Sequence, residues 1–201
     1  MSIDPAAGFP QAAYIDPSVR LFGAVEIGEQ ASLWPYAVVR AESHFVRIGR
    51  LSNLQDHVMV HVGYAQPTII GEYCSITHRA VLHGCSIGDN CLIGIGATVM
   101  EGAVIGANSI VAGHSFVADG TVIPANSIVM GTPAKVVRTA NNFVANRINA
   151  MLYQRNAECY ARGEHRGWEG EAYEREARRW RQEAERQFAE LTAASPDADR
   201  R

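Results

Sequence analysis

Aliphatic residues recur every six positions through residues 15–129, and the next position is often Gly or Ala. This period fits neither an amphipathic helix, which repeats about every 3.6 residues, nor a strand, which alternates about every two. It predicts a parallel β-helix, in which each hexad is a short strand followed by a corner. The nineteen aliphatic positions are Ile15, Leu21, Ile27, Leu33, Val39, Ile48, Leu54, Val60, Ile70, Ile76, Leu82, Ile87, Ile93, Val99, Ile105, Val111, Val117, Ile123 and Val129.

Three hexads make one triangular coil of about 18 residues, so the pattern predicts about six coils. The aliphatic side chains point inward and stack on those of the next coil at a spacing of about 4.8 Å. We label the sides of the triangle A, B and C in the order of the hexads. Side A includes the hexads that begin at Leu54 and Ile76, and side B those that begin at Val39, Val60 and Leu82.

The period slips three times, with three extra residues after Val39, four extra after Val60 and one missing after Leu82. Extra residues must bulge outward from the stack. The two bulges fall near 42–47 and 63–68, on either side of His61. Loops on a rigid scaffold are common places for functional sites.

A column of polar residues is expected on the outside of side B. Arg40, His61 and His83 each follow the aliphatic residue of a side B hexad, in consecutive coils. The two histidines can therefore share one metal ion within a single chain. Solvent-exposed surface residues are the alternative interpretation, because polar residues commonly occupy outer faces.

A third histidine, His78, lies on side A in the coil that contains His83, with Asp56 beside it in the preceding coil. It cannot reach the metal of its own chain, so a three-histidine site needs His78 from a neighbouring subunit. Side A of one chain must then face side B of the next, which closes as a three-fold ring. The sequence thus predicts a homotrimer with three metal sites at subunit interfaces.

The hexads stop after Arg138. We expect a β-helix domain over residues 1–138, a helical appendage over 139–192 and a disordered tail over 193–201. The appendage has one predicted helix over 142–161, a glycine-rich hinge over 163–170 and an amphipathic second helix. The second helix either docks on its own trimer or binds a partner.

Composition excludes several classes of function. The formal net charge of -3 argues against a basic surface that would bind nucleic acid or an anionic membrane. No apolar stretch is long enough to span a membrane, and residues 1–14 lack the pattern of a signal peptide. The four cysteines form no CxxC pair, which favours reduced thiols in a cytoplasmic protein.

Four segments resemble the γ-class carbonic anhydrases, a branch of the left-handed β-helix hexapeptide-repeat proteins. They are Ser-Leu-Trp-Pro-Tyr-Ala-Val-Val-Arg at 32–40, Asn-Leu-Gln-Asp at 53–56 followed by His61, Thr-His-Arg-Ala-Val-Leu-His-Gly-Cys at 77–85, and Met-Gly-Thr-Pro-Ala-Lys-Val-Val-Arg at 130–138. The resemblance covers about residues 10–138. The last segment is shared with hexapeptide acyltransferases. The resemblance implies a mainly β, left-handed parallel β-helix followed by C-terminal α-helices.

The resemblance also implies a metal centre. His61, His78 and His83 would bind Zn²⁺, with Fe²⁺ or Co²⁺ as alternatives, and the second of them would come from the adjacent subunit. Gln55 would orient the metal-bound water, while Arg40 and Asp56 would form ion pairs that brace the interface.

Two departures from the family pattern concern proton transfer. Glu42 stands where the family usually has Asp, and Ser43 and Tyr64 stand where the prototype has proton-shuttling glutamates. Glu42 and Tyr64 are therefore the candidate catalytic residues near the bulges. Tyr153 is a further candidate, because relatives can place a tyrosine of the C-terminal helix near the neighbouring site; core packing is its alternative role.

The implied reaction is the reversible hydration of CO2 to bicarbonate by hydroxide on a three-histidine zinc. Two other functions stay open. One is a hexapeptide-repeat acyltransferase that uses an acyl-CoA, favoured by the fold and by residues 131–134. The other is a metal-binding scaffold with little anhydrase activity.

Overall fold

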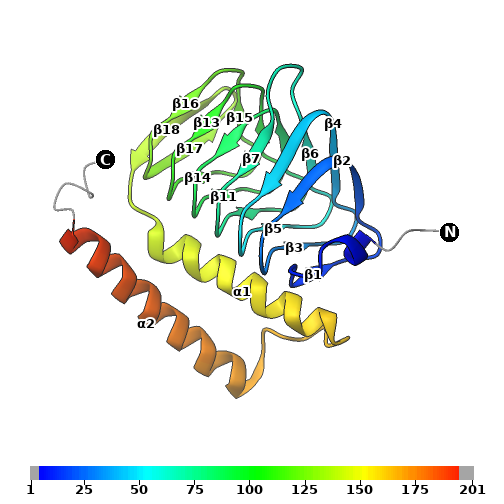
Figure 1. Ribbon diagram of the computed structural model, residues 1–201. Coiled ribbons are helices and arrows are strands. Elements are labelled where there is room, and N and C mark those ends of the chain that lie inside the picture. Colours follow the sequence, from blue (N-terminus) through cyan, green and yellow to red (C-terminus); the bar gives the residue numbers. More distant parts are fainter. Residues whose placement is uncertain (1–4, 195–201) are drawn as a thin grey trace.

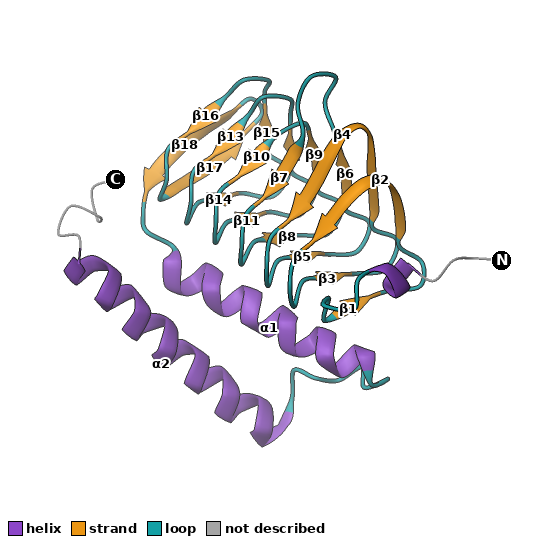
Figure 2. Ribbon diagram, viewed as in Figure 1, coloured by secondary structure: helices purple, strands orange, loops and turns teal. Residues whose placement is uncertain are grey.

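The computed structural model describes residues 5–194 and forms a left-handed parallel β-helix of about six coils, followed by two C-terminal α-helices (Figures 1 and 2). A short 3-10 helix, Pro5–Gly8, precedes the first coil. The fold class predicted from the six-residue period is confirmed.

Side A of the coils is one sheet of eight strands. In spatial order its strands are β1 (Tyr14–Ile15), β3 (Ser32–Leu33), β5 (Asn53–Leu54), β8 (Ser75–Ile76), β11 (Leu92–Ile93), β14 (Ile110–Val111), β17 (Ser127–Gly131) and β18 (Ala134–Thr139). All neighbouring pairs are parallel except β17 and β18, which form an antiparallel hairpin at the end of the stack.

Sides B and C form a second sheet of ten strands, joined because the long β4 bends from one side to the other. Its path is β15 (Phe116–Val117), β12 (Thr98–Val99), β9 (Val81–His83), β6 (Met59–His61), β4 (Val38–Ile48), β7 (Thr68–Ile70), β10 (Ser86–Ile87), β13 (Val104–Ile105) and β16 (Val122–Ile123), with β2 (Arg20–Ile27) paired to β4.

The register between coils follows the hexad count. Val39 pairs with Val60, and Val60 pairs with Leu82, as the slips require. The pairing of β2 with β4 skips from Ala41 to Phe45, which leaves three residues to bulge outward. The aliphatic hexad positions are all buried except Leu21, which is half-buried against the same core.

Three asparagines support one corner of the triangle. Asn90, Asn108 and Asn126 have φ of 58°, 59° and 60°, a left-handed conformation that asparagine tolerates better than most residues. Their side-chain amides form a ladder, in which Asn90 donates to Asn108 at 3.0 Å and Asn108 donates to Asn126 at 3.2 Å. The ladder ties three consecutive coils together along the corner where the first C-terminal helix begins.

Helix α1 (Phe143–Ala161) runs back along side A from the last coils to the first (Figure 1). Buried Asn146 anchors its start, because its amide donates to the carbonyl of Asn90 at 2.8 Å and to that of Ser109 at 3.2 Å. Near its end, the Tyr160 ring packs against Trp34 and Tyr14 of the first coils. These contacts hold the end of the helix next to the corner between sides A and B.

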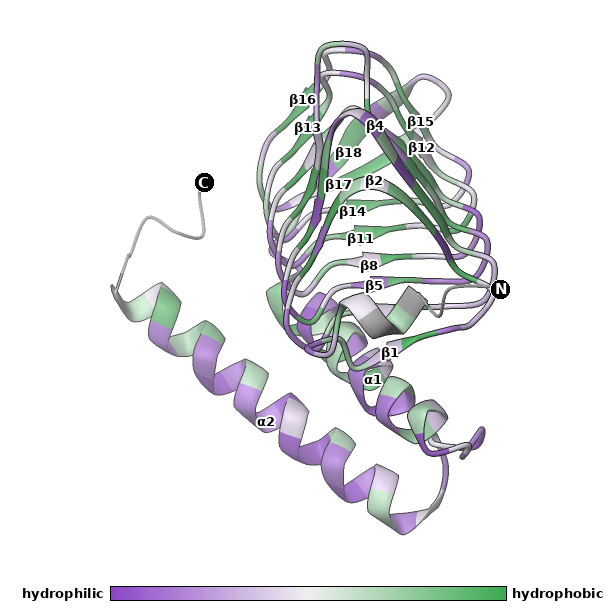
Figure 3. Ribbon diagram, turned by 45° about the vertical axis from the view of Figure 1, so that its right-hand side comes forward, coloured by the Kyte–Doolittle hydropathy of each residue, from purple (hydrophilic) through white to green (hydrophobic). Residues whose placement is uncertain are grey.

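Helix α2 (Gly170–Ala194) packs on α1 and stands away from the coils (Figure 3). Trp180 and Ala184 are buried, and Phe188 stacks on Phe143 with ring centroids 6.0 Å apart. The predicted apolar stripe of the second helix therefore docks on its own chain. The helix includes the first two residues of the tail predicted at 193–201, and the rest of that tail lies outside the described residues.

Other sequence predictions concern cysteines and membranes. Cys74, Cys85, Cys91 and Cys159 are all free and buried, and burial raises the pKa of the Cys85 thiol to about 12. Within the described part of the chain, no helix has the length and apolar character needed to cross a membrane.

The Asn146 anchor predicts that Asn146→Ala destabilises the protein by about 1–3 kcal/mol, because the buried Asn90 carbonyl loses its side-chain donor and the Ser109 carbonyl keeps only the Leu92 N–H. Urea unfolding followed by circular dichroism measures the change. Glu158→Ala, an exposed change on the same helix, is the control and should stay within about 0.5 kcal/mol of the parent. Equal stabilities of the two variants would contradict the anchoring role.

Candidate metal centre

The two histidines of side B lie in one column. Arg40 pairs in register with His61 and His61 with His83, across β4, β6 and β9. The imidazole centroids of His61 and His83 are 5.1 Å apart and their planes meet at 62°. Two neutral imidazoles at this separation suit a metal ion that sits between them, because zinc–nitrogen bonds are about 2.0–2.1 Å long.

One nitrogen of His83 has an unusual environment. Its Nδ1 atom is buried and has no hydrogen-bond partner among the described residues. A buried polar atom without a hydrogen-bond partner lowers the stability of the folded protein by about 1–3 kcal/mol, so a ligand that pairs with it is favoured. A metal ion or an ordered water would satisfy an imidazole nitrogen of this kind.

His78 lies at the corner between sides A and B, one coil above Asp56. Its Nδ1 is 3.0 Å from Asp56 Oδ2. Because a carboxylate only accepts, Nδ1 carries the proton of the neutral ring, and Nε2 keeps a free lone pair. A carboxylate behind a histidine is the arrangement that commonly orients metal ligands. The His78 side chain is also 42% exposed, so this lone pair is accessible from outside the chain.

One chain alone does not complete a ligand set. Across residues 5–194, no group of three His, Cys, Asp or Glu side chains could hold a metal ion. The predicted division, with two histidines on side B and one on side A, agrees with this geometry. The sharing of the site between subunits stays a prediction.

Glu42, in the first bulge, contacts the histidine column. It forms an ion pair with Arg40, and its Oε2 is 3.0 Å from His61 Nε2. Desolvation works to raise its pKa, but hydrogen bonds from Arg40 and His61 outweigh that and hold the pKa below the usual range. Glu42 is consequently a weak base, and a metal ion that binds His61 through Nε2 must replace this contact.

Within one chain, Arg40 and Asp56 form ion pairs on the surface of that chain. Arg40 pairs with Glu42, and Asp56 pairs with His78. Side-chain pairing depends on what else is within reach, and register alone does not decide it. The ion pairs expected across a subunit interface stay a prediction.

Gln55 is 2% exposed and is held by a short network on side A. Its amide donates to Asn53 Oδ1 at 3.0 Å, and the Asn53 amide donates to Ser75 Oγ at 3.1 Å. Asn53 and Ser75 were not among the predicted site residues, although both are polar residues just before an inward aliphatic position. The network gives the Gln55 side chain a fixed orientation next to Asp56.

Thr68 is a third residue that was not among the predicted site residues. It is fully buried, its hydroxyl donates to the His61 carbonyl at 2.6 Å, and the Gly84 N–H donates to that hydroxyl at 2.9 Å. It therefore joins the ends of the two histidine-bearing strands. Its signal was available, because a polar residue directly after the second bulge stands where most coils have Ala, Cys or Val.

Glu101, which lies two coils further along the stack, holds the second bulge. Its Oε1 accepts from the N–H of Ala65 at 3.2 Å, and its side chain fills the space next to Gly63. Tyr64, at the tip of the same bulge, is 94% exposed. The structure therefore places Tyr64 outside the histidine column of its own chain.

Tyr153 of α1 lies close to His78. The two side chains line one cavity of about 240 Å³ with Asp56 and Trp34. Burial, and then the nearness of Asp56, raise the pKa of Tyr153 to about 12. The phenol is thus a poor proton acceptor at neutral pH, which agrees with a packing or hydrogen-bonding role.

The fold and the histidine arrangement define a hexapeptide-repeat protein with a candidate metal centre, and comparisons with known proteins agree. The family model "Bacterial transferase hexapeptide (six repeats)" matches residues 84–119. The chain is 49% identical over 140 residues to a "Probable carbonic anhydrase" of Methanocaldococcus jannaschii, which covers 69% of this chain and 88% of that protein. It is also 40% identical over 103 residues to the mitochondrial gamma carbonic anhydrase 1 of Arabidopsis thaliana, covering 48% of this chain and 38% of that protein.

The solved structures similar to this chain include an enzyme of another class. A putative acetyltransferase of Bacillus cereus superposes with a TM-score of 0.67 at 29% identity, covering 73% of this chain and 90% of that one. The relative from Methanocaldococcus jannaschii is similar enough over enough of the chain to decide the family. The chain belongs to the γ-class carbonic anhydrase-like hexapeptide-repeat proteins.

The position of Thr68 predicts that Thr68→Val destabilises the protein by about 0.5–1.5 kcal/mol, because the His61 carbonyl and the Gly84 N–H each lose the hydroxyl but keep their direct hydrogen bond of 3.0 Å to one another. Thr68→Ser keeps the hydroxyl and is the matched control. Denaturant unfolding of both variants measures the difference. A valine variant as stable as the serine variant would show that the bridge does not support the histidine column.

Proposed function

We propose that this protein is a zinc-dependent γ-class carbonic anhydrase that interconverts CO2 and bicarbonate as a homotrimer. The observation that carries the proposal is the arrangement of three histidines. His61 and His83 lie in register on side B, while His78, oriented by Asp56, presents its free nitrogen outward from the adjacent corner.

The geometry of the sides supports a trimer, but α1 covers the face of side A that was expected to meet side B of the next chain. The contact is therefore assigned to the corner that carries His78. His78 belongs to another side of the triangle than the histidine column, so a neighbouring chain must bring its own His78 to that column. Repetition of one such contact closes as a ring with three equivalent sites. Side B also carries a half-buried apolar column next to the histidines that would suit an interface. It consists of Val38, Met59 and Val81 in consecutive coils, with Phe116 beyond Thr98.

The donor set fits zinc. Three neutral imidazoles match the ligands of catalytic zinc sites, and imidazole also accepts Fe²⁺ or Co²⁺. Zinc bound there would supply the Lewis acid that lowers the pKa of water toward neutrality. Water adds to CO2 in the reaction, which yields bicarbonate and one proton.

The other residues have positioning roles in this proposal. Asp56 fixes the tautomer of His78. Gln55, whose amide is held by Asn53, orients the reacting water. Arg40 and Asp56 stay the candidates for ion pairs that brace the interface, which requires an exchange of partners on assembly.

Proton export is the slow part of the proposed reaction. Glu42 is the candidate acceptor that contacts a ligand histidine, but its lowered pKa makes it a weak base. Tyr64 is exposed at the tip of the bulge, and Tyr153 has a raised pKa. We therefore expect a turnover that rises with the concentration of an added buffer.

Two alternative functions can be tested by measurements on the same purified protein. The likeness to a putative acetyltransferase and the β17–β18 hairpin favour an acyl-CoA-dependent acyltransferase. The weak proton acceptors favour a metal-binding scaffold with little anhydrase activity. Coenzyme A binding would support the first alternative, and full zinc loading without CO2 hydration would support the second.

The proposal predicts one zinc per chain in the parent protein and less than about a tenth of that in His61→Ala and His83→Ala, because each loses one of three ligands. Elemental analysis measures the metal, and stopped-flow CO2 hydration measures the activity. His114→Ala changes an exposed histidine of a later coil and should keep both. Full zinc content in either ligand variant would refute the site.

A further inference from the structure

A cavity of about 240 Å³ lies between α1, the corner of sides A and B, and the linker before α2. Four aromatic side chains line it, together with the hydrogen-bonded pair of Asp56 and His78. The walls include Trp34, Tyr153, Tyr160, Trp168, Asp56 and His78. The three-histidine proposal uses only Asp56 and His78, so it does not explain the aromatic walls.

The rings meet at steep angles. Trp34 and Tyr153 are perpendicular at 90° with centroids 5.6 Å apart, and Tyr153 and Trp168 meet at 81° and 5.3 Å. Tyr160 meets Trp34 at 69° and 4.9 Å. Edge-to-face packing of this kind holds the rings rigidly against one another. The cavity therefore lies along a fixed aromatic cluster, and aromatic rings attract organic cations.

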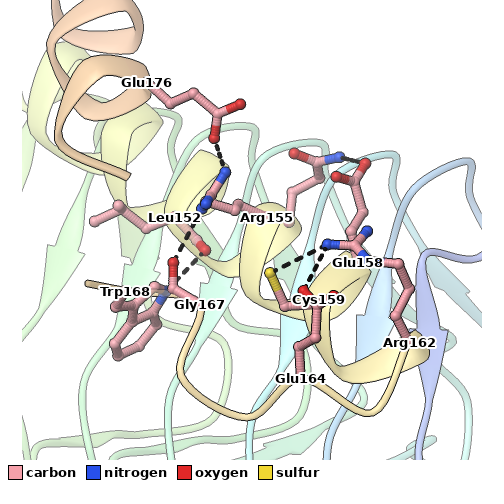
Figure 4. Close-up of polar contacts among 10 residues, drawn as sticks. Leu152, Arg155, Glu158, Cys159, Arg162, Glu164, Gly167, Trp168 and Glu176 are labelled. Atoms are coloured by element: carbon pink, nitrogen blue, oxygen red, sulfur yellow. Dashed lines mark hydrogen bonds and ion pairs between the residues drawn. The ribbon is translucent and has the colours of Figure 1, made fainter. Parts of the chain in front are cut away.

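Trp168 is held in place although it is 45% exposed. Its indole N–H donates to the Leu152 carbonyl at 3.1 Å, and Arg155 of α1 donates to the carbonyl of Gly167 at 3.0 Å (Figure 4). Arg155 also pairs with Glu176 of α2, which ties both helices to the linker. An exposed tryptophan fixed by this many contacts is a preformed wall rather than a mobile surface residue.

The charge of the cavity also suits a cation. Asp56 contributes a carboxylate, and no Lys or Arg is among the described residues that line the cavity. The Tyr153 phenol stays neutral because burial raises its pKa to about 12. The cavity is therefore aromatic with one negative end.

We propose that this cavity binds a small quaternary ammonium compound, with the cationic head against the aromatic rings and near Asp56. A second cavity of about 350 Å³ shares Asn156, Tyr160 and Trp168 with it and provides room for the rest of the molecule. Arg166 lines that second cavity, so the cationic head is assigned to the first one. The site adjoins the proposed CO2 site and shares Asp56 and His78 with it. It requires no metal.

Choline and 3,3-dimethyl-1-butanol test the role of charge, because they have nearly the same shape and only choline is cationic. Metal-free full-length protein is titrated with each, and tryptophan fluorescence and one-dimensional NMR line broadening report binding. The proposal predicts saturable choline binding at least about tenfold tighter than that of the neutral alcohol. Equal affinities, or no choline binding, would overturn it.

Variants locate the site. Trp168→Leu and Tyr153→Leu should each weaken choline binding about three- to tenfold by NMR, since each removes one ring. Tyr36→Leu removes an aromatic ring that is 60% exposed and lies outside the cavity, and it should bind choline like the parent. Circular dichroism confirms folding of each variant. Unchanged binding by both cavity variants would place choline elsewhere and refute the proposal.

Discussion

The structure depends on one constraint, which is the stacking of inward aliphatic side chains at the spacing of hydrogen-bonded strands. Each coil buries its apolar face only against its neighbours, so the six-residue register must hold from coil to coil. Position in the sequence then becomes position in a column. The pairing of His61 with His83 is a direct result of this constraint, because a slip of one residue would turn one histidine toward the core.

This constraint explains how much the sequence alone could predict. The coil register, the outward bulges and the approach of Asp56 to His78 all follow from counting hexads, and the structure has them. Contacts made by long or buried polar side chains do not follow from the count. Arg40 pairs with Glu42 because that carboxylate is within reach of its side chain. Thr68 bridges two strand ends because its hydroxyl is buried between them.

The C-terminal helices illustrate the same division. Helix α1 was predictable from its composition, and the apolar stripe of α2 was predictable from apolar spacing. The anchoring of Trp168 was not, since it depends on Leu152 and on the linker meeting in space. The aromatic cavity and the histidine corner consequently share Asp56 and His78 through tertiary packing that no linear motif describes. A rigid coil thus supplies the metal ligands, and the helices supply the surroundings of one of them.

The central claim is that the metal centre is shared between subunits, and mixed trimers test it most directly. Chains with His78→Ala and chains with His61→Ala are each expected to bind no zinc alone. When they are co-expressed, about a quarter of the interfaces would join an intact His78 to an intact His61–His83 pair, because each partner has an even chance of being the required one. The account predicts recovery of about a quarter of the parent zinc content and CO2 hydration. A mixture that recovers neither, although mixed trimers form, would contradict it.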